Sequence, residues 1–190
     1  MIAGIDEAGR GPLVGPVVAA AVVINAPLPI IVKDSKLLSE KKRADYAEII
    51  KLHCTYAIGI ASSKEIDELN ILQASLLAMS RAYHSLKVRP EKVLVDGNKG
   101  PNLPCQVECI IKGDLTIPAI SAASILAKVT RDAIMDEYHA LYPQYEFNRH
   151  KGYPTKAHLH ALNEHGVIPD IYRLTYKPVK RIIEAEDANA

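Results

Sequence analysis

The sequence predicts an α/β fold in which a central mixed β-sheet is flanked by helices. Short apolar runs rich in valine and isoleucine alternate with longer segments whose apolar residues recur at helical spacing. The first two runs follow one another closely, as in a hairpin, whereas later runs are separated by a helical segment, as in a parallel crossover. A sheet that contains both kinds of connection is mixed.

The first half of the chain contains three predicted strands and two predicted helices. The strands span residues 2–6, 17–24 and 54–61. A helix over 40–53 follows Ser39, whose hydroxyl is suited to cap its first turn. Ser62 and Glu65 have the spacing of a capping box. We therefore expect one long helix from there to about Leu86, with an apolar stripe along it.

The second half contains two more strands and then helices. We expect strands over 92–95 and 107–111, and helices over 121–141 and 155–164, the last one stopped by Gly166. A loop region over 143–154 separates these two helices. A chain of 190 residues is long enough for one domain with a small appendage. We expect residues 1–142 to form the core and residues 143–190 a C-terminal helical extension of the same compact unit.

The composition excludes several classes of protein. The three cysteines form no disulfide framework, and no leader or membrane-spanning run is evident, so we expect a cytoplasmic protein with no membrane partner. No heptad pattern is present, which favours a monomer. The formal net charge is only +1, but basic residues outnumber acidic ones between residues 146 and 181. That local excess indicates either a solvated face or a surface that contacts a nucleic-acid backbone.

Four carboxylates stand where predicted strands end. Asp6, Asp96 and Asp114 each follow a short hydrophobic run, and Glu7 adjoins the first of them. One such aspartate is usually a turn former or a cap. Parallel neighbours, however, would bring several to one edge of the sheet, where they would repel each other unless a divalent cation were bound. Oxygen ligands favour Mg²⁺ or Mn²⁺ over zinc. Asp6 and Glu7 can share a site only if their strand ends there.

A glycine-rich turn that carries an arginine follows at once, at Gly9, Arg10 and Gly11. Such a turn lets backbone N–H groups and a guanidinium approach a phosphodiester closely. Two metal ions can activate a water and stabilise the leaving oxygen without a protein nucleophile, and no Ser/His/Asp arrangement is evident. Together the carboxylates and the turn indicate a nucleic-acid phosphodiesterase.

Six segments, taken together, resemble ribonuclease HII. They are residues 6–18, 34–43, 67–79, 95–98, 120–132 and 150–155, in the order found in that family. The resemblance implies a ribonuclease H-like fold and metal-dependent cleavage of the RNA strand of RNA–DNA hybrids. It also implies incision 5′ to single ribonucleotides in duplex DNA, leaving a 3′-hydroxyl and a 5′-phosphate. Such an enzyme removes ribonucleotides from DNA and takes part in RNA primer removal.

The resemblance also assigns residues to roles. It implies that Asp6, Glu7, Asp96 and Asp114 are the catalytic metal ligands for a two-metal site holding Mn²⁺ or Mg²⁺. Gly9, Arg10 and Gly11 would read the ribose 2′-hydroxyl together with Tyr153, and Ser35 and Lys36 would grip a substrate phosphate.

The segments also contain polar and charged residues outside these assignments. Lys128 and Arg131 face either the phosphates or solvent. An ion pair with a helical neighbour explains Asp132 as well as a place in the metal site does. His150 and Lys151 are candidates for lining the substrate groove.

Two other functions stay open at this point. A non-catalytic nucleic-acid-binding module of the same fold would tolerate loss of the carboxylates, all of which are present. A junction resolvase-like nuclease would be insensitive to a 2′-hydroxyl.

Overall fold

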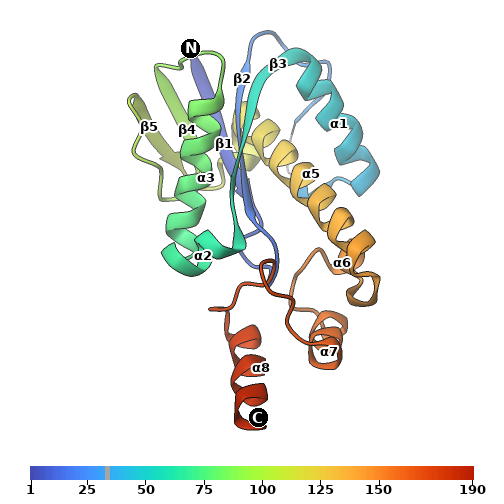
Figure 1. Ribbon diagram of the computed structural model, residues 1–190. Helices are drawn as coiled ribbons and strands as arrows, with labels where there is room; N and C mark the ends of the chain where they lie inside the picture. The colour runs from blue at the N-terminus through green and yellow to red at the C-terminus, as the bar shows by residue number, and fades with distance from the viewer. Residues whose placement is uncertain (33–34) are drawn as a thin grey trace.

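A mixed β-sheet forms the centre of the molecule, seen here in a computed structural model that describes residues 1–32 and 35–190 (Figure 1). Its strands are β1 (Ile2–Ala8), β2 (Val17–Ile24), β3 (Cys54–Ala61), β4 (Lys92–Asp96) and β5 (Gln106–Ile110), in the spatial order β3-β2-β1-β4-β5. The pairs β1–β2 and β2–β3 are antiparallel, whereas β1–β4 and β4–β5 are parallel. The predicted mixed sheet with early hairpins and later crossovers is therefore confirmed.

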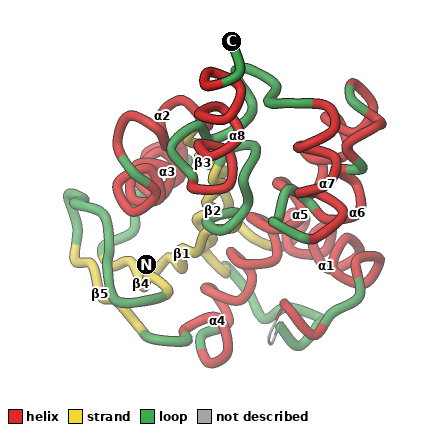
Figure 2. Tube along the Cα trace, turned by 90° about the horizontal axis from the view of Figure 1, so that it is seen from below, coloured by secondary structure: helices red, strands yellow, loops and turns green. Residues whose placement is uncertain are grey.

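Helices cover both faces of the sheet. The long ones are α1 (Glu40–His53), α3 (Ile71–Ser85), α5 (Pro118–Leu141), α7 (Lys156–His165) and α8 (Lys177–Ala188). Shorter helices are α2 (Ser63–Leu69), α4 (Gly113–Thr116) and α6 (Phe147–His150), with 3₁₀ turns η1 (Ser35–Leu37) and η2 (Pro143–Tyr145). Seen from below, α2 and α3 lie on one side of the sheet and α1 and α5 on the other (Figure 2).

Strand β2, which lies between β3 and β1, is buried on both faces, as its unbroken apolar sequence requires. Alternate residues serve different layers: Ala19 and Ala21 belong to the cluster with α3, and Ala20 and Val22 to the cluster with α1 and α5. On β1, a Cβ atom at Gly4 would collide with the backbone at the start of α5. The glycine therefore lets α5 approach β1 closely enough to bring its side chains to the end of that strand.

The prediction of one long helix after the capping box is wrong. The capping box at Ser62 and Glu65 is present, but the helix ends at Leu69 and a new one begins at Ile71. Asn70, between them, has a φ of 75° and its side-chain oxygen accepts a hydrogen bond from the Gln73 amide at 2.9 Å. Asparagine tolerates this left-handed region and caps the second helix, so it divides the apolar stripe into two helices.

The C-terminal segment is more helical than the sequence predicts. Residues 143–154, which we expect to be a loop, contain η2 and α6, and α8 was not predicted at all. This segment packs around a third cluster that joins Phe147 and Tyr172 to Leu13, Val14 and Met135. The division of the chain at residue 142 stays a prediction, since this cluster draws on both sides of it. Within residues 1–32 and 35–190, no helix is both long and apolar enough to cross a membrane.

Candidate active site

Three acidic residues lie where neighbouring strands end. Asp6 is near the end of β1, and the parallel register that pairs Ile5 with Val95 brings Asp96, the last residue of β4, beside it. Asp114 lies in α4, just after β5, and its amide donates a hydrogen bond to Asp96 Oδ1 at 3.2 Å. Adjacent parallel strands thus bring together carboxylates that are far apart in the sequence.

Glu7 completes the set, although β1 does not end where we expected. The strand continues to Ala8, and the chain turns at Gly9 with a φ of 94°. The two adjacent acids still interact: burial raises the pKa of Asp6 well above its usual value, and the charges of Glu7 and Asp96 raise it further. Burial also raises the pKa values of Glu7 and Asp96.

This acidic group fits a hard divalent cation. Its donors are all carboxylate oxygens, and one of them, Glu7 Oε2, is buried without a hydrogen-bond partner among the described residues. An unpaired buried carboxylate oxygen is costly, and a cation would relieve both that cost and the mutual repulsion. Within residues 1–32 and 35–190, no three potential ligands are grouped as a metal site. The side chains would therefore have to rearrange to share one ion.

A cavity of about 280 Å³ opens beside Glu7. It is lined by Glu7, Ala8, Gly9, Arg10, Gly11, Ser35, Lys36, Arg43, Ser124, Lys128 and Tyr153. All six residues that the resemblance assigns to substrate binding therefore meet in one place. Cations face the acids across it: Arg10 Nη1 is 3.8 Å from Glu7 Oε1, and Lys36 Nζ is 3.7 Å from Asp114 Oδ2.

Two residues of this cavity were missed by the sequence analysis. The hydroxyl of Ser124, from α5, is 2.8 Å from that of Ser35 and also hydrogen bonds the Asp6 carboxylate. Arg43, from α1, donates to the carbonyls of Ser35 at 3.1 Å and Leu38 at 2.9 Å, which holds η1 in position. Asp34, which begins the second resembling segment, lies outside the described residues.

The ion pair expected for Asp132 is confirmed. Lys128 Nζ donates to Asp132 Oδ1 at 2.7 Å, one turn along α5, so Lys128 reaches the cavity wall with its charge partly balanced. Asp132 also lies 3.8 Å from Arg43 Nη1. It is thus a partner of two cavity cations.

Arg131 faces neither phosphates nor solvent, so both alternatives considered for it are wrong. It is buried, and it donates to the carbonyls of Val14 and Lys151 at 2.7 Å and of Pro16 at 3.1 Å. Burial lowers its pKa to about 10. A Cβ atom at Gly9 would collide with this side chain. Arg131 is therefore a structural cation beneath the turn.

His150 and Lys151 do not line the cavity, contrary to expectation. The His150 ring is buried and stacks on that of His158, with 4.1 Å between their centroids. The Lys151 ammonium pairs with Glu40 at 2.9 Å and Asp136 at 3.3 Å. Of the segment 150–155, only Tyr153 lines the cavity, and its ring lies beside Gly11.

Comparison with known proteins agrees with this geometry. Residues 3–179 match the family described as Ribonuclease HII. The chain belongs to the ribonuclease HII family. A "Ribonuclease HII" of Marinomonas sp. (strain MWYL1) is 56% identical over 187 residues, which cover 97% of this chain and 94% of the relative.

Solved structures of ribonucleases H have the same fold. The ribonuclease H2 of Pyrococcus horikoshii OT3 has a TM-score of 0.78 and 30% identity, covering 97% of both chains. Bst-RNase HIII, solved in complex with Mn²⁺, has a TM-score of 0.75 at 18% identity and covers 98% of this chain and 70% of its own. The predicted ribonuclease H-like fold is thereby confirmed.

Membership of the ribonuclease HII family establishes the activity in outline. The protein is a metal-dependent endoribonuclease that acts on the RNA strand of RNA–DNA hybrids, with roles in DNA repair and replication. The family depends on divalent metal.

Proposed function

We propose that the cavity beside Glu7 is where this ribonuclease HII recognises a ribonucleotide and hydrolyses the phosphodiester 5′ to it. The supporting observation is that one cavity combines Glu7, which belongs to the acidic group, with a glycine-rich turn and an exposed tyrosine. Its substrates would be RNA–DNA hybrids and duplex DNA with an embedded ribonucleotide, and its products a 3′-hydroxyl and a 5′-phosphate.

Asp6, Glu7, Asp96 and Asp114 would hold Mg²⁺ or Mn²⁺. When bound, a pair of such ions supplies an activated water and stabilises the leaving oxygen. The carboxylates are suited to this because Asp6 and Asp114 are buried, Asp6 interacts with Glu7 and Asp96, and Glu7 Oε2 has no hydrogen-bond partner among the described residues. Burial raises the pKa values of Asp6, Glu7 and Asp96, and a bound cation would oppose that shift.

The other wall of the cavity would bind and select the substrate. Backbone groups of the turn at Gly9–Gly11 can both donate to and accept from a 2′-hydroxyl, and the Tyr153 ring beside Gly11 can pack on the neighbouring sugar. Ser35, Lys36 and Lys128 would contact phosphate oxygens. Lys36 and Arg10 would do so while their charges also balance the acids.

Incision of a DNA duplex that contains one ribonucleotide, with an all-DNA duplex as control, tests the proposal. We expect a single cut 5′ to the ribonucleotide, dependent on Mg²⁺ or Mn²⁺ and absent from the control. Binding without cutting would favour the non-catalytic module. Equal cutting of both duplexes would favour a resolvase-like nuclease and would contradict recognition of the 2′-hydroxyl by the turn.

Arg10→Ala tests the turn itself. We expect substrate affinity to fall about tenfold and preference for single ribonucleotides to weaken, since a charged hydrogen-bonding group beside the phosphate is lost. Arg149→Ala is a matched control, because Arg149 also pairs with a glutamate three residues away, at 3.4 Å, but lines no part of the cavity. Unchanged selectivity in Arg10→Ala would contradict the role given to the turn.

The cytoplasmic location and the monomeric state stay predictions. Both rest on the sequence, where three unpaired cysteines and the absence of a heptad pattern favour them.

A further inference from the structure

The backbone of the Gly9–Gly11 turn is held by two residues near the other end of the chain. Arg173, which is fully buried, donates from Nη2 to the Gly9 carbonyl at 2.5 Å and from Nη1 to the Arg10 carbonyl at 3.0 Å. The Tyr176 hydroxyl donates to the same Arg10 carbonyl at 2.6 Å. It also accepts a hydrogen bond from Arg173 Nη1 at 3.0 Å. Two consecutive carbonyls of the turn therefore have fixed partners.

Arg173 is not present to balance a negative charge. Among the described residues no carboxylate lies within ion-pair distance of it, and its remaining donors go to the carbonyls of Gly15 at 2.9 Å and Pro16 at 3.2 Å. A buried cation without a counter-ion is costly, and carbonyl dipoles are its compensation here. Its guanidinium also lies 5.1 Å from the centroid of the Tyr176 ring.

The segment that carries both residues is itself anchored. Asp67, in α2, accepts hydrogen bonds from the amides of Leu174 and Thr175 at 3.0 Å and from the Thr175 hydroxyl at 2.8 Å. Arg173 and Tyr176 flank this anchor, so their positions relative to the sheet are set on both sides.

The amides of Arg10 and Gly11 belong to the same peptide units as the two held carbonyls. A hydrogen bond to a carbonyl polarises its peptide group and strengthens the N–H on the other side, and a cationic donor does so most. Neither N–H has an acceptor among residues 1–32 and 35–190, and both residues line the cavity. The turn thus presents two polarised, unoccupied donors.

We propose that Arg173 and Tyr176 are positioning residues for specificity: they orient and polarise the Arg10 and Gly11 amides so that the turn distinguishes a 2′-hydroxyl from a 2′-hydrogen. The inference rests on the proposed reading of the 2′-hydroxyl by this turn. It adds that the selectivity depends on residues that contact no substrate.

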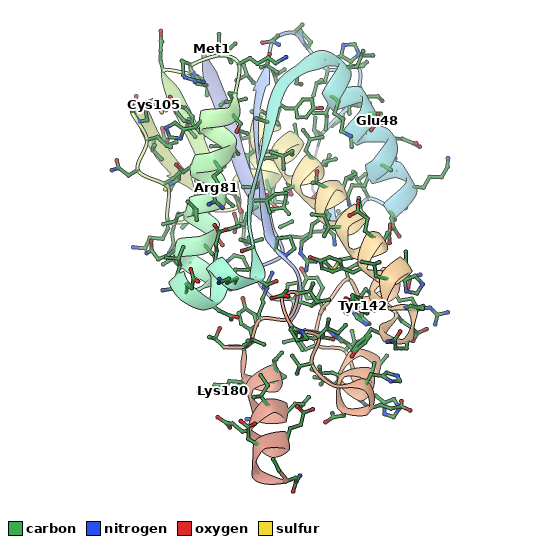
Figure 3. The ribbon with its side chains drawn as sticks, in the orientation of Figure 1. Met1, Glu48, Arg81, Cys105, Tyr142 and Lys180 are labelled. Atoms are coloured by element: carbon green, nitrogen blue, oxygen red, sulfur yellow. The ribbon has the colours of Figure 1, made fainter. Side chains whose placement is uncertain are left out.

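Two substitutions test the proposal: one removes a single hydrogen bond to the turn, and the other alters several. Tyr176→Phe removes one donor to the Arg10 carbonyl and keeps the ring. Arg173→Lys keeps the charge but replaces the planar five-donor guanidinium with a compact ammonium that cannot reach all of these carbonyls. Tyr145→Phe and Arg81→Lys are matched controls. Tyr145 donates to the Gly166 carbonyl at 2.7 Å, and Arg81 donates to the Ile60 carbonyl at 2.7 Å, away from the turn. Arg81 lies on α3, at the level of the sheet (Figure 3).

The measurement is binding of a labelled DNA duplex with one ribonucleotide and of the same duplex with a deoxyribonucleotide there, in EDTA so that nothing is cut. We expect the ratio of the two affinities to fall about threefold in Tyr176→Phe and about tenfold in Arg173→Lys, and to be unchanged in both controls. Amide proton shifts of Arg10 and Gly11 should move upfield in both variants, which a loss of general stability would not cause.

Each outcome has one meaning. An unchanged ratio, or an equal loss of affinity for both duplexes, would overturn the role of Arg173 and Tyr176. If Arg173→Lys fails to fold, Tyr176→Phe decides. A wild-type protein that binds both duplexes equally would instead overturn the reading of the 2′-hydroxyl on which the inference rests.

Discussion

The two walls of the cavity differ in whether their polar groups have partners within the protein. The acidic wall, where Glu7 lines the cavity and Asp6, Asp96 and Asp114 are grouped with it, comes from the ends of neighbouring strands and the short helix after β5. Its groups repel one another, and one buried oxygen has no partner. The reading wall, formed by the Gly9–Gly11 turn and Tyr153, is assembled from distant segments. Buried arginines satisfy the carbonyls around it.

This difference indicates that the reading wall is stable without a ligand, whereas the acidic wall requires one. The reading wall has the carbonyls of Gly9, Arg10 and Tyr153 paired within the protein, so it can keep its shape without substrate. The acidic wall is unfavourable by itself and becomes favourable only with positive charge. The two walls should therefore respond differently to substitution, to metal and to pH.

The largest expected effect is on the acidic wall. Asp6→Asn should lower the rate of incision at least about 100-fold, since changes even to the partners of metal ligands cost up to that much. The metal-free protein should nevertheless melt at the same temperature or higher, because one buried charge is removed. Incision assays with Mg²⁺ or Mn²⁺ and thermal unfolding in EDTA measure both, with Asp45→Asn as a surface control. Substantial activity in Asp6→Asn would refute the metal assignment.

The acidic wall is also the part that the sequence predicts best. The position of an aspartate after a hydrophobic strand is local information, and parallel pairing does the rest, as for Asp6 and Asp96. The strands were likewise predictable, since their ends fall within about two residues of expectation. The helix broken at Asn70 was not, because one residue in the left-handed region outweighed a continuous apolar stripe.

The supports of the reading wall could not be predicted in this way. Arg131 has the spacing of a surface residue beside Lys128, yet it is buried because three carbonyls from two segments converge on it. Arg173 and Tyr176 lie more than 150 residues from the turn that they hold. No local pattern marks a residue whose partners are backbone atoms far along the chain. The six segments that resemble ribonuclease HII include the Gly9–Gly11 turn, but they do not include Arg173 and Tyr176, which support it.

The next effect is expected on the pH dependence of folding stability, which should differ in sign between the two walls. Burial, followed by the charge of His150, whose ring stacks on it, lowers the pKa of His158 to about 4, although the Tyr153 carbonyl, 2.9 Å from its Nδ1, opposes the shift. Between pH 6.5 and 4 the unfolded chain therefore binds more protons than the folded one, and stability falls as the pH falls. The loss should approach about 3 kcal/mol.

Chemical denaturation across this pH range, in wild type and His158→Asn, measures the effect. Asparagine keeps a donor for the Tyr153 carbonyl but does not titrate, so the slope should flatten. His160→Asn, on the exposed side of the same helix, should leave it unchanged. The acidic wall should respond in the opposite sense, since carboxyls with raised pKa values favour the folded state at low pH. An equal slope in His158→Asn would show that His158 is not the titrating group.

A smaller effect on stability is expected when a methyl group is added to the turn on the side that faces Arg131. Gly9→Ala places a Cβ against the Arg131 side chain at a φ of 94°, and should cost about 2 kcal/mol of unfolding free energy. Gly97→Ala separates the causes, because Gly97 has a φ of 93° with open space around it. We expect about 1 kcal/mol there, by urea denaturation. Equal costs at both positions would mean that Arg131 yields, and that the turn is held less firmly than the contacts indicate.

The smallest expected effect lies where the two walls meet. The Ser124 hydroxyl hydrogen bonds both to Ser35 and to the Asp6 carboxylate, and the second bond lowers the Asp6 pKa against the effect of burial. In Ser124→Ala that pKa should rise further, so the acidic limb of the pH–rate profile should move to higher pH. Activity at neutral pH should fall about threefold. Ser75→Ala, which removes a buried hydroxyl bonded to the Ile71 carbonyl in α3, is the control. A profile that does not move would mean that the walls act independently, and that Ser124 only supports the phosphate side.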